Sequence, residues 1–138
     1  MIKNIGINEA LKLGVKAHKV GNLNEADKYY TAILKAHPNH PQANHNMGIL
    51  AVSVGKVSEA LPFFRAALEA NSEIGQFWIS YIDALIKLER VNDAHAIFKD
   101  AIEKGIQGQG LSELEKIFSS LKKKPQKAVN KPQAPPQD

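Results

Sequence analysis

The chain has 138 residues, of which 43% are hydrophobic and 23% charged, a composition that fits one globular domain with a modest core. It contains no cysteine, which excludes disulfide frameworks, thiolate metal sites and cysteine nucleophiles. The net charge of +4 resides in residues 122–138, and residues 1–121 are neutral overall, which argues against a structured surface for nucleic acid.

The first residues, MIKNIGINEALKL, lack the apolar run of a signal peptide. No stretch approaches the roughly 18 apolar residues that a membrane span needs. We therefore predict a cytoplasmic protein that does not insert into a membrane.

A pattern repeats at 34-residue intervals and predicts three helix-turn-helix units at about residues 7–40, 41–74 and 75–108. In each unit the second helix has an alanine followed four residues later by an aromatic residue: Ala26 and Tyr30, Ala60 and Phe64, Ala94 and Phe98. This spacing places a small and a large side chain on the same buried face. Gly14 and Gly48 interrupt the first helices, which is tolerable if two helices must pack closely there.

The helix boundaries have their own sequence signals. Asn24, Ser58 and Asn92 are predicted to cap the second helices, and Pro62 is predicted to lie in the first turn of its helix. Gly21 and Gly55 are expected to end the first helices. Glu89 replaces glycine at this position in the third unit, so we expect that turn to be the least regular.

After the third unit, the sequence LSELEKIFSSLKK predicts a helix at about residues 111–123. It is either a capping helix, the interpretation we favour, or the first half of a fourth unit. Residues 122–138 are rich in Lys, Pro and Gln and are predicted to form a disordered linker or tail. A chain ending in such a segment is typical of the front part of a longer protein.

Taken together, these positions resemble the tetratricopeptide repeat (TPR) family. The first unit matches the family pattern at Leu13, Gly14, Ala17, Gly21, Ala26, Tyr30 and Pro38. The second has Ser72 in place of the closing proline, and the third lacks both glycines and the proline. The resemblance implies an all-α fold: a right-handed α-solenoid of three TPR repeats with a terminal capping helix over residues 1–121. It is similar to the N-terminal TPR arrays of bacterial multidomain proteins.

In such a solenoid the first helix of each repeat lines a concave groove. The candidate peptide-binding residues on these helices are Asn8, Leu11, Val15, His18, Gln42, His45, Asn46, Ile49, Val52, Gln76, Ile79, Asp83 and Ile86. Several are aliphatic, which indicates either a groove for a peptide or protein partner or a surface covered by the chain's own first residues or terminal helix. With about three aliphatic anchors we expect micromolar affinity.

One subset of the family clamps the terminal carboxylate of a peptide with lysine, asparagine and arginine side chains. The corresponding positions here hold Leu11, Val15, Asn46, Gln76 and Ser80, so only Asn46 matches. A carboxylate needs charge-assisted donors, and we therefore do not expect this clamp. Asn46 either bonds to the backbone of a bound peptide or is solvated.

No set of residues predicts catalysis or a metal site. His37, His40 and His45 lie within nine residues, but no nearby carboxylate or cysteine completes a ligand set. His18 and His45 are candidates to approach each other across the groove. We expect no cofactor and no enzymatic activity.

Three functions remain open at this stage. The favoured one is a non-catalytic protein-protein interaction module that binds a peptide or protein segment. The second is the substrate-recruiting N-terminal region of a larger bacterial glycosyl-, methyl- or sulfotransferase. The third is a scaffold that self-associates weakly through its end faces.

Overall fold

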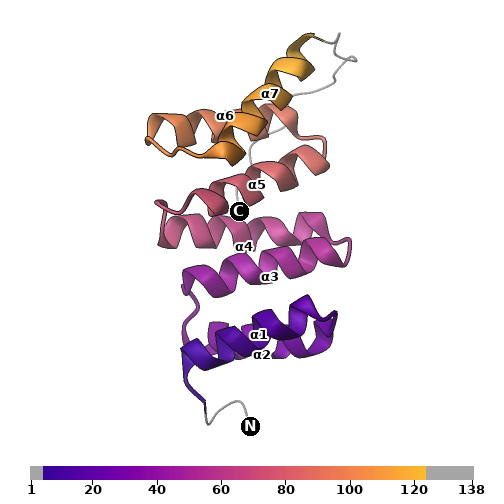
Figure 1. Cartoon of the computed structure of the whole chain (residues 1–138), viewed down its shortest axis with the longest axis vertical. Helices are drawn as coiled ribbons and strands as arrows, with labels where there is room; N and C mark the ends of the chain where they lie inside the picture. The colour runs from indigo at the N-terminus through magenta and orange to yellow at the C-terminus, as the bar shows by residue number, and fades with distance from the viewer. Residues whose placement is uncertain (1–4, 124–138) are drawn as a thin grey trace. The chain divides into compact units, whose positions relative to one another are not determined.

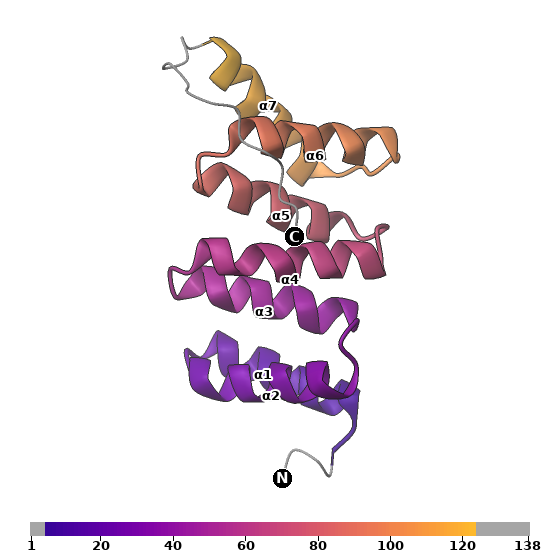
Figure 2. The same ribbon diagram turned by 180° about the vertical axis from the view of Figure 1, so that it is seen from behind.

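The computed structural model describes residues 5–123, and the side chains of residues 5–121. The described residues form seven α-helices: α1 (Ile7–Lys19), α2 (Leu23–Ala36), α3 (Pro41–Ser53), α4 (Val57–Ala70), α5 (Gly75–Lys87), α6 (Val91–Glu103) and α7 (Gln109–Lys123) (Figures 1 and 2). The all-α prediction is confirmed. Helices α1–α4 form one compact unit and α5–α7 another, divided after Ser72. Most of the predicted linker lies outside the described residues.

The helices follow the 34-residue frame of the sequence. The first helices begin at Ile7, Pro41 and Gly75, and the second helices at Leu23, Val57 and Val91. Helix α7 begins at Gln109, which is the start position of a fourth first helix. No helix within residues 5–123 combines the length and the apolar character that crossing a membrane requires.

Two predicted boundary features are wrong. Helices α2, α4 and α6 begin one residue before Asn24, Ser58 and Asn92, so these residues lie inside the first turn. The residue before α2, Asn22, is the cap instead, and its side chain accepts a hydrogen bond from Glu25 N–H (3.3 Å). The cap residues of α4 and α6, Lys56 and Arg90, accept no side-chain hydrogen bond from a backbone N–H of the first turn. The reason is that the turns are tight. The residue whose N–H closes the first helix is also the residue directly before the second helix: Asn22, Lys56 and Arg90.

Pro62 is also misplaced by the prediction, because it is the sixth residue of α4 and lies inside the helix. A proline there removes one helical N–H bond. Its side chain is exposed, so the carbonyl that loses its donor can be hydrated from the solvent side.

The turns that end the first helices share one backbone geometry. Gly21 and Gly55 have φ values of 85° and 83°, in the left-handed region. Each turn has two closing hydrogen bonds, from Gly21 N–H to the His18 carbonyl and from Asn22 N–H to the Ala17 carbonyl in the first repeat. This is the Schellman arrangement, which favours glycine. Glu89 adopts the same conformation with φ of 63°, and is the one non-glycine residue with positive φ in the described part of the chain.

Replacing Glu89 with glycine is expected to raise the free energy of unfolding by about 0.5–1 kcal/mol. The left-handed conformation costs a side chain roughly 1–2 kcal/mol, and part of the gain is offset by the greater freedom of glycine in the unfolded chain. Urea denaturation measures the change. Gly55→Ala is the reverse control and should be destabilising. The positive φ alone opposes the methyl group, because apart from the two adjoining residues no heavy atom lies within 4 Å of the added Cβ. Destabilisation by Glu89→Gly would show that the glutamate makes a compensating contact.

Close packing between paired helices explains the glycines of the first helices. A Cβ on Gly14 would lie 2.6 Å from Cε1 of Tyr30, and a Cβ on Gly48 would lie 2.6 Å from Cδ1 of Phe64. Both rings are almost fully buried. Ala26 and Ala60 are also buried completely, as the small-to-large pattern predicts. In the first two repeats the aromatic ring of the second helix therefore packs on the glycine of the first helix.

Helix α7 packs against α5 and α6 through one face only. Leu111, Leu114 and Phe118 are buried, and the Phe118 ring lies 5.2 Å from Phe98 and 5.0 Å from His95, measured between ring centroids. The opposite face carries Ser112, Glu115, Lys116, Ser119 and Ser120, which are all exposed.

Candidate functional site

The groove face of the first unit contains a cavity of about 270 Å³ between α1 and α3. It is lined by Val15, His18, Lys19, Tyr30, Asn46 and Ile49. Four of these six were predicted as groove residues and come from two different repeats. The repeat geometry thus brings together side chains that are more than 25 residues apart in the sequence.

The cavity has apolar walls and an aromatic floor. Val15 of α1 and Ile49 of α3 are half-buried, and each keeps part of its side chain accessible. Tyr30 of α2 is only 1% exposed and closes the bottom. Burial raises the pKa of the Tyr30 hydroxyl, and its hydrogen bond with Asn46 partly opposes this shift. The phenol is therefore neutral and can serve only as a hydrogen-bonding group.

Asn46 is held in place by its neighbours. The Gln42 side-chain amide donates a hydrogen bond to Oδ1 of Asn46 (3.0 Å), and the Asn46 side chain also bonds to the Tyr30 hydroxyl. Asn46 is therefore not a freely solvated side chain, which was one of its two predicted roles. A fixed amide at the edge of an apolar cavity is suited to bind the backbone of an extended peptide.

His18 connects α1 with α3 at the other end of the cavity. Its Nε2 lies 3.0 Å from Oγ of Ser53. The Ser53 hydroxyl donates its single hydrogen to the Ile49 carbonyl (2.9 Å), so it must accept from His18. This requires a proton on Nε2 of His18 and fixes the orientation of the imidazole.

The expected approach of His18 and His45 across the groove is not observed: His18 bonds to Ser53, and His45 packs elsewhere. His45 is 6% exposed, and its ring is tilted against Phe64 with centroids 5.6 Å apart. Little of His45 is left for a partner to contact. Among the other predicted residues of the first unit, Leu11 packs against the core, Val52 is half-buried and Asn8 is exposed.

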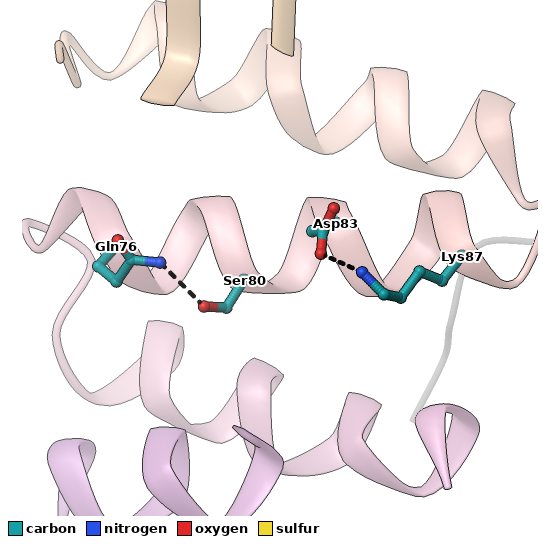
Figure 3. Close-up of polar contacts among 4 residues, drawn as sticks. All are labelled: Gln76, Ser80, Asp83 and Lys87. Carbon is teal, nitrogen blue, oxygen red and sulfur yellow. Dashed lines mark hydrogen bonds and ion pairs between the residues drawn. The ribbon is translucent and has the colours of Figure 1, made fainter. Parts of the chain in front are cut away.

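In the second unit the predicted residues lie on α5, and two of them bond to other side chains of the same helix (Figure 3). The Gln76 amide donates to Oγ of Ser80 (3.2 Å), and Lys87 Nζ lies 2.8 Å from a carboxylate oxygen of Asp83. Both members of the Asp83–Lys87 pair are about half exposed, so the pair contributes little to stability. Ile86 is half-buried.

Ile79 is covered in part by the terminal helix. Its side chain lies directly against Gly110 in the first turn of α7, where any Cβ would collide with it. The two alternatives for the aliphatic groove residues, an open groove and a surface covered by the chain itself, therefore apply to different residues. Helix α7 covers Ile79, whereas Val15 and Ile49 border a cavity that is not filled by side chains of the first unit.

The three clustered histidines have separate structural positions. His40 caps α3, with its Nδ1 accepting a hydrogen bond from Ala43 N–H (3.0 Å), and His45 is buried beside Phe64. His37 is exposed in the turn before them. Among the side chains that the structure describes, no three His, Cys, Asp or Glu residues are placed to hold a metal ion together.

We expect the free energy of unfolding to fall as the pH is lowered from 7.5 to 5.5. Burial, followed by the charge of His37, lowers the pKa of His40 below 6.5, and burial lowers the pKa of His45. A lowered histidine pKa favours the neutral form in the folded state. The contribution of such a histidine to the free energy of unfolding is therefore complete above pH 6.5 and is lost as the pH falls below it. Protonated Nδ1 of His40 also cannot accept from Ala43, and losing a cap costs about 0.5–2 kcal/mol. Urea denaturation at both pH values measures this.

The control for this pH dependence is His40→Asn, which keeps a cap acceptor and removes the titrating group. This variant should retain its stability at pH 7.5 and lose less of it at pH 5.5, with a residual slope from His45. An unchanged pH slope in His40→Asn would exclude the cap as the cause.

Two residues of the cavity were not predicted. Lys19 follows Val15 by four residues and lies on the same helix face, so helical spacing alone was sufficient to find it. Tyr30 was assigned only to the core, and no sequence signal separates a fully enclosed ring from one that also forms the floor of a cavity.

Solved structures with the same fold were found at low sequence identity. The TPR domain of P58(IPK) superposes with a TM-score of 0.74 at 20% identity, over 84% of this chain and 32% of that one. The TPR2B domain of yeast Sti1, in a structure described as a pHsp70 complex, has a TM-score of 0.70 at 19% identity, over 84% of this chain and 95% of that one. The first TPR of Spaghetti (RPAP3), bound to the HSP90 peptide SRMEEVD, has a TM-score of 0.71 at 23% identity, over 86% and 97%.

No protein-family model and no curated protein matches the chain. The structural matches and the helix-turn-helix repeats nevertheless identify the fold as that of a TPR domain.

Proposed function

We propose that the chain is a non-catalytic interaction module that binds a peptide or protein segment in the groove of its first unit. The observation that carries this proposal is the cavity between α1 and α3, which has aliphatic walls at Val15 and Ile49 and a fixed amide at Asn46. An apolar side chain of the partner would enter the cavity, and its backbone would bond to the amide. TPR domains of similar fold are bound to HSP90 and Hsp70 segments, which supports the same general role here.

The segment is proposed to be internal to its protein and not a chain terminus. The positions where the resemblance predicts clamp residues hold Leu11, Val15, Gln76 and Ser80 besides Asn46, and none of these is a cation. The one cation that lines the cavity, Lys19, is exposed and stands outside these positions, so a terminal carboxylate buried at them would lose hydration without the charged donors of a clamp. An internal segment does not carry this cost.

The expected affinity is modest. Burying one aliphatic side chain contributes about 1.5–3 kcal/mol, which must offset the association cost. Contacts beyond the cavity are needed to reach micromolar binding, and attachment to a larger protein would raise the effective concentration.

The experiment is a selection of binders from a displayed library of random internal peptides, followed by NMR titration of the ¹⁵N-labelled chain with the strongest binders. The largest shift changes are expected at Val15, Asn46 and Ile49. Changes centred on the exposed residues of α2 or α4, or a failure of all selected peptides to shift the groove residues, would contradict the proposal.

A further inference from the structure

We infer that the groove of the first unit is selective for a segment whose aliphatic anchor is flanked by acidic side chains. This inference rests on the proposed function and specifies the chemistry of the partner. It is carried by the distribution of charge on the two helices that border the cavity.

Helix α1 supplies the positive charge. It carries Lys12, Lys16 and Lys19 and a single acid, Glu9. Lys19 lines the cavity itself. Lys12 precedes it by seven residues, which is two helical turns or about 10 Å along the same face. Lys12 and Lys19 therefore share one face of α1, and their long, flexible side chains can approach acidic side chains about 7 Å apart on an extended segment.

Helix α3 has no charge to balance these lysines. Its sequence contains no Asp, Glu, Lys or Arg, and the residues that occupy the repeat positions of Lys12 and Lys19 are Asn46 and Ser53. Glu9 is three residues from Lys12 and ten residues from Lys19, about 15 Å along the helix from the latter. Within residues 5–121, neither Lys12 nor Lys19 forms an ion pair. Acidic side chains from a partner would complement them.

The groove of the second unit does not share this character. On α5 the only cation, Lys87, is paired with Asp83, and Ile79 is covered by α7. The preference for acidic segments is therefore assigned to α1 and α3 alone.

Lysines in the last turn of a helix also stabilise the helix through its dipole, so the test must separate the two roles. Lys12→Glu/Lys19→Glu reverses the charge on the groove face. Lys28→Glu/Lys35→Glu is a matched control, because these lysines are also exposed, seven residues apart and end in the last turn of α2. Both variants change the net charge equally, and any loss of helix stability through the dipole affects both.

The probes are synthetic peptides with blocked ends that carry one central leucine flanked by glutamate, glutamine or lysine residues. They are titrated by NMR into the full chain at 50 mM and 500 mM salt. We expect the glutamate peptide to bind about three- to tenfold more tightly than the glutamine peptide at low salt, and this ratio to fall toward one at high salt. The groove variant should abolish the preference, and the control variant should keep it.

Several outcomes would overturn the inference. Equal binding of the glutamate and glutamine peptides would remove the acidic preference while leaving the groove function intact. A tenfold gain on freeing the peptide carboxyl terminus would point to terminus recognition, and tighter binding of a single-stranded oligonucleotide would point to phosphate. If no peptide shifts Val15 or Ile49, the proposed function fails together with this inference.

Discussion

Replacing Ile49 with glutamate is expected to weaken binding of selected peptides by at least tenfold while leaving the fold intact. Ile49 lines the cavity opposite Val15, and the loss of one buried aliphatic contact corresponds to about 1.5–3 kcal/mol. A carboxylate at this place would also repel acidic flanking residues of the partner. Because the side chain is only half-buried, the melting temperature should change little. Isothermal titration calorimetry and circular dichroism measure the two effects.

Ile102→Glu is the matched control for this experiment. Ile102 is 50% exposed on α6 in the other unit, so the same substitution should not change peptide binding. Ile49→Ala should give an intermediate loss, since it shortens the contact without adding a charge. If Ile49→Glu binds as tightly as the unchanged protein, the groove between α1 and α3 is not the binding surface.

Replacing Gly48 with alanine is expected to destabilise the fold, although alanine normally stabilises a helix by about 1 kcal/mol relative to glycine. The added Cβ would lie 2.6 Å from Cδ1 and 2.9 Å from Cζ of Phe64, a ring that is only 1% exposed and is therefore enclosed by protein. Overpacking of this kind costs about 1–3 kcal/mol, so we expect a net loss of up to about 2 kcal/mol. Urea denaturation measures it.

Gly75→Ala separates this clash from the general effect of removing glycine. A Cβ on Gly75 would meet Ile106 Cγ2 at 3.5 Å, an ordinary contact, so this variant should be neutral or slightly stabilised. Combining Gly48→Ala with Phe64→Leu should show a favourable coupling energy, because the smaller side chain makes room for the methyl group. If Gly48→Ala proves more stable than the unchanged protein, the helices can separate at this point without cost.

The repeat made the fold class predictable from the sequence. Small and aromatic residues recur in fixed register, and helical spacing places Ala26 beside Tyr30 and Ala60 beside Phe64 on a face that is buried. The third turn was expected to be the least regular, but Glu89 adopts the same left-handed conformation, with the same two closing hydrogen bonds, as the glycines of the other repeats. These features depend on contacts within one repeat, and the sequence records such contacts directly.

The helix caps were not predictable to the residue. Asn24, Ser58 and Asn92 have cap-forming side chains, but the turn geometry starts each helix one residue earlier. Local propensity indicates a helix start only approximately, because the backbone bonds of the preceding turn decide which residue first becomes helical.

The sequence by itself determined the helical faces, and therefore which residues of the first helices were candidates for the groove. Only the tertiary structure decided what surrounds each of them: Val15 and Ile49 border a cavity, His45 is buried against Phe64, and Ile79 lies against α7. Helical periodicity specifies the direction of a side chain around its own axis. What that side chain meets depends on the neighbouring helix, and this is set by packing between residues far apart in the chain.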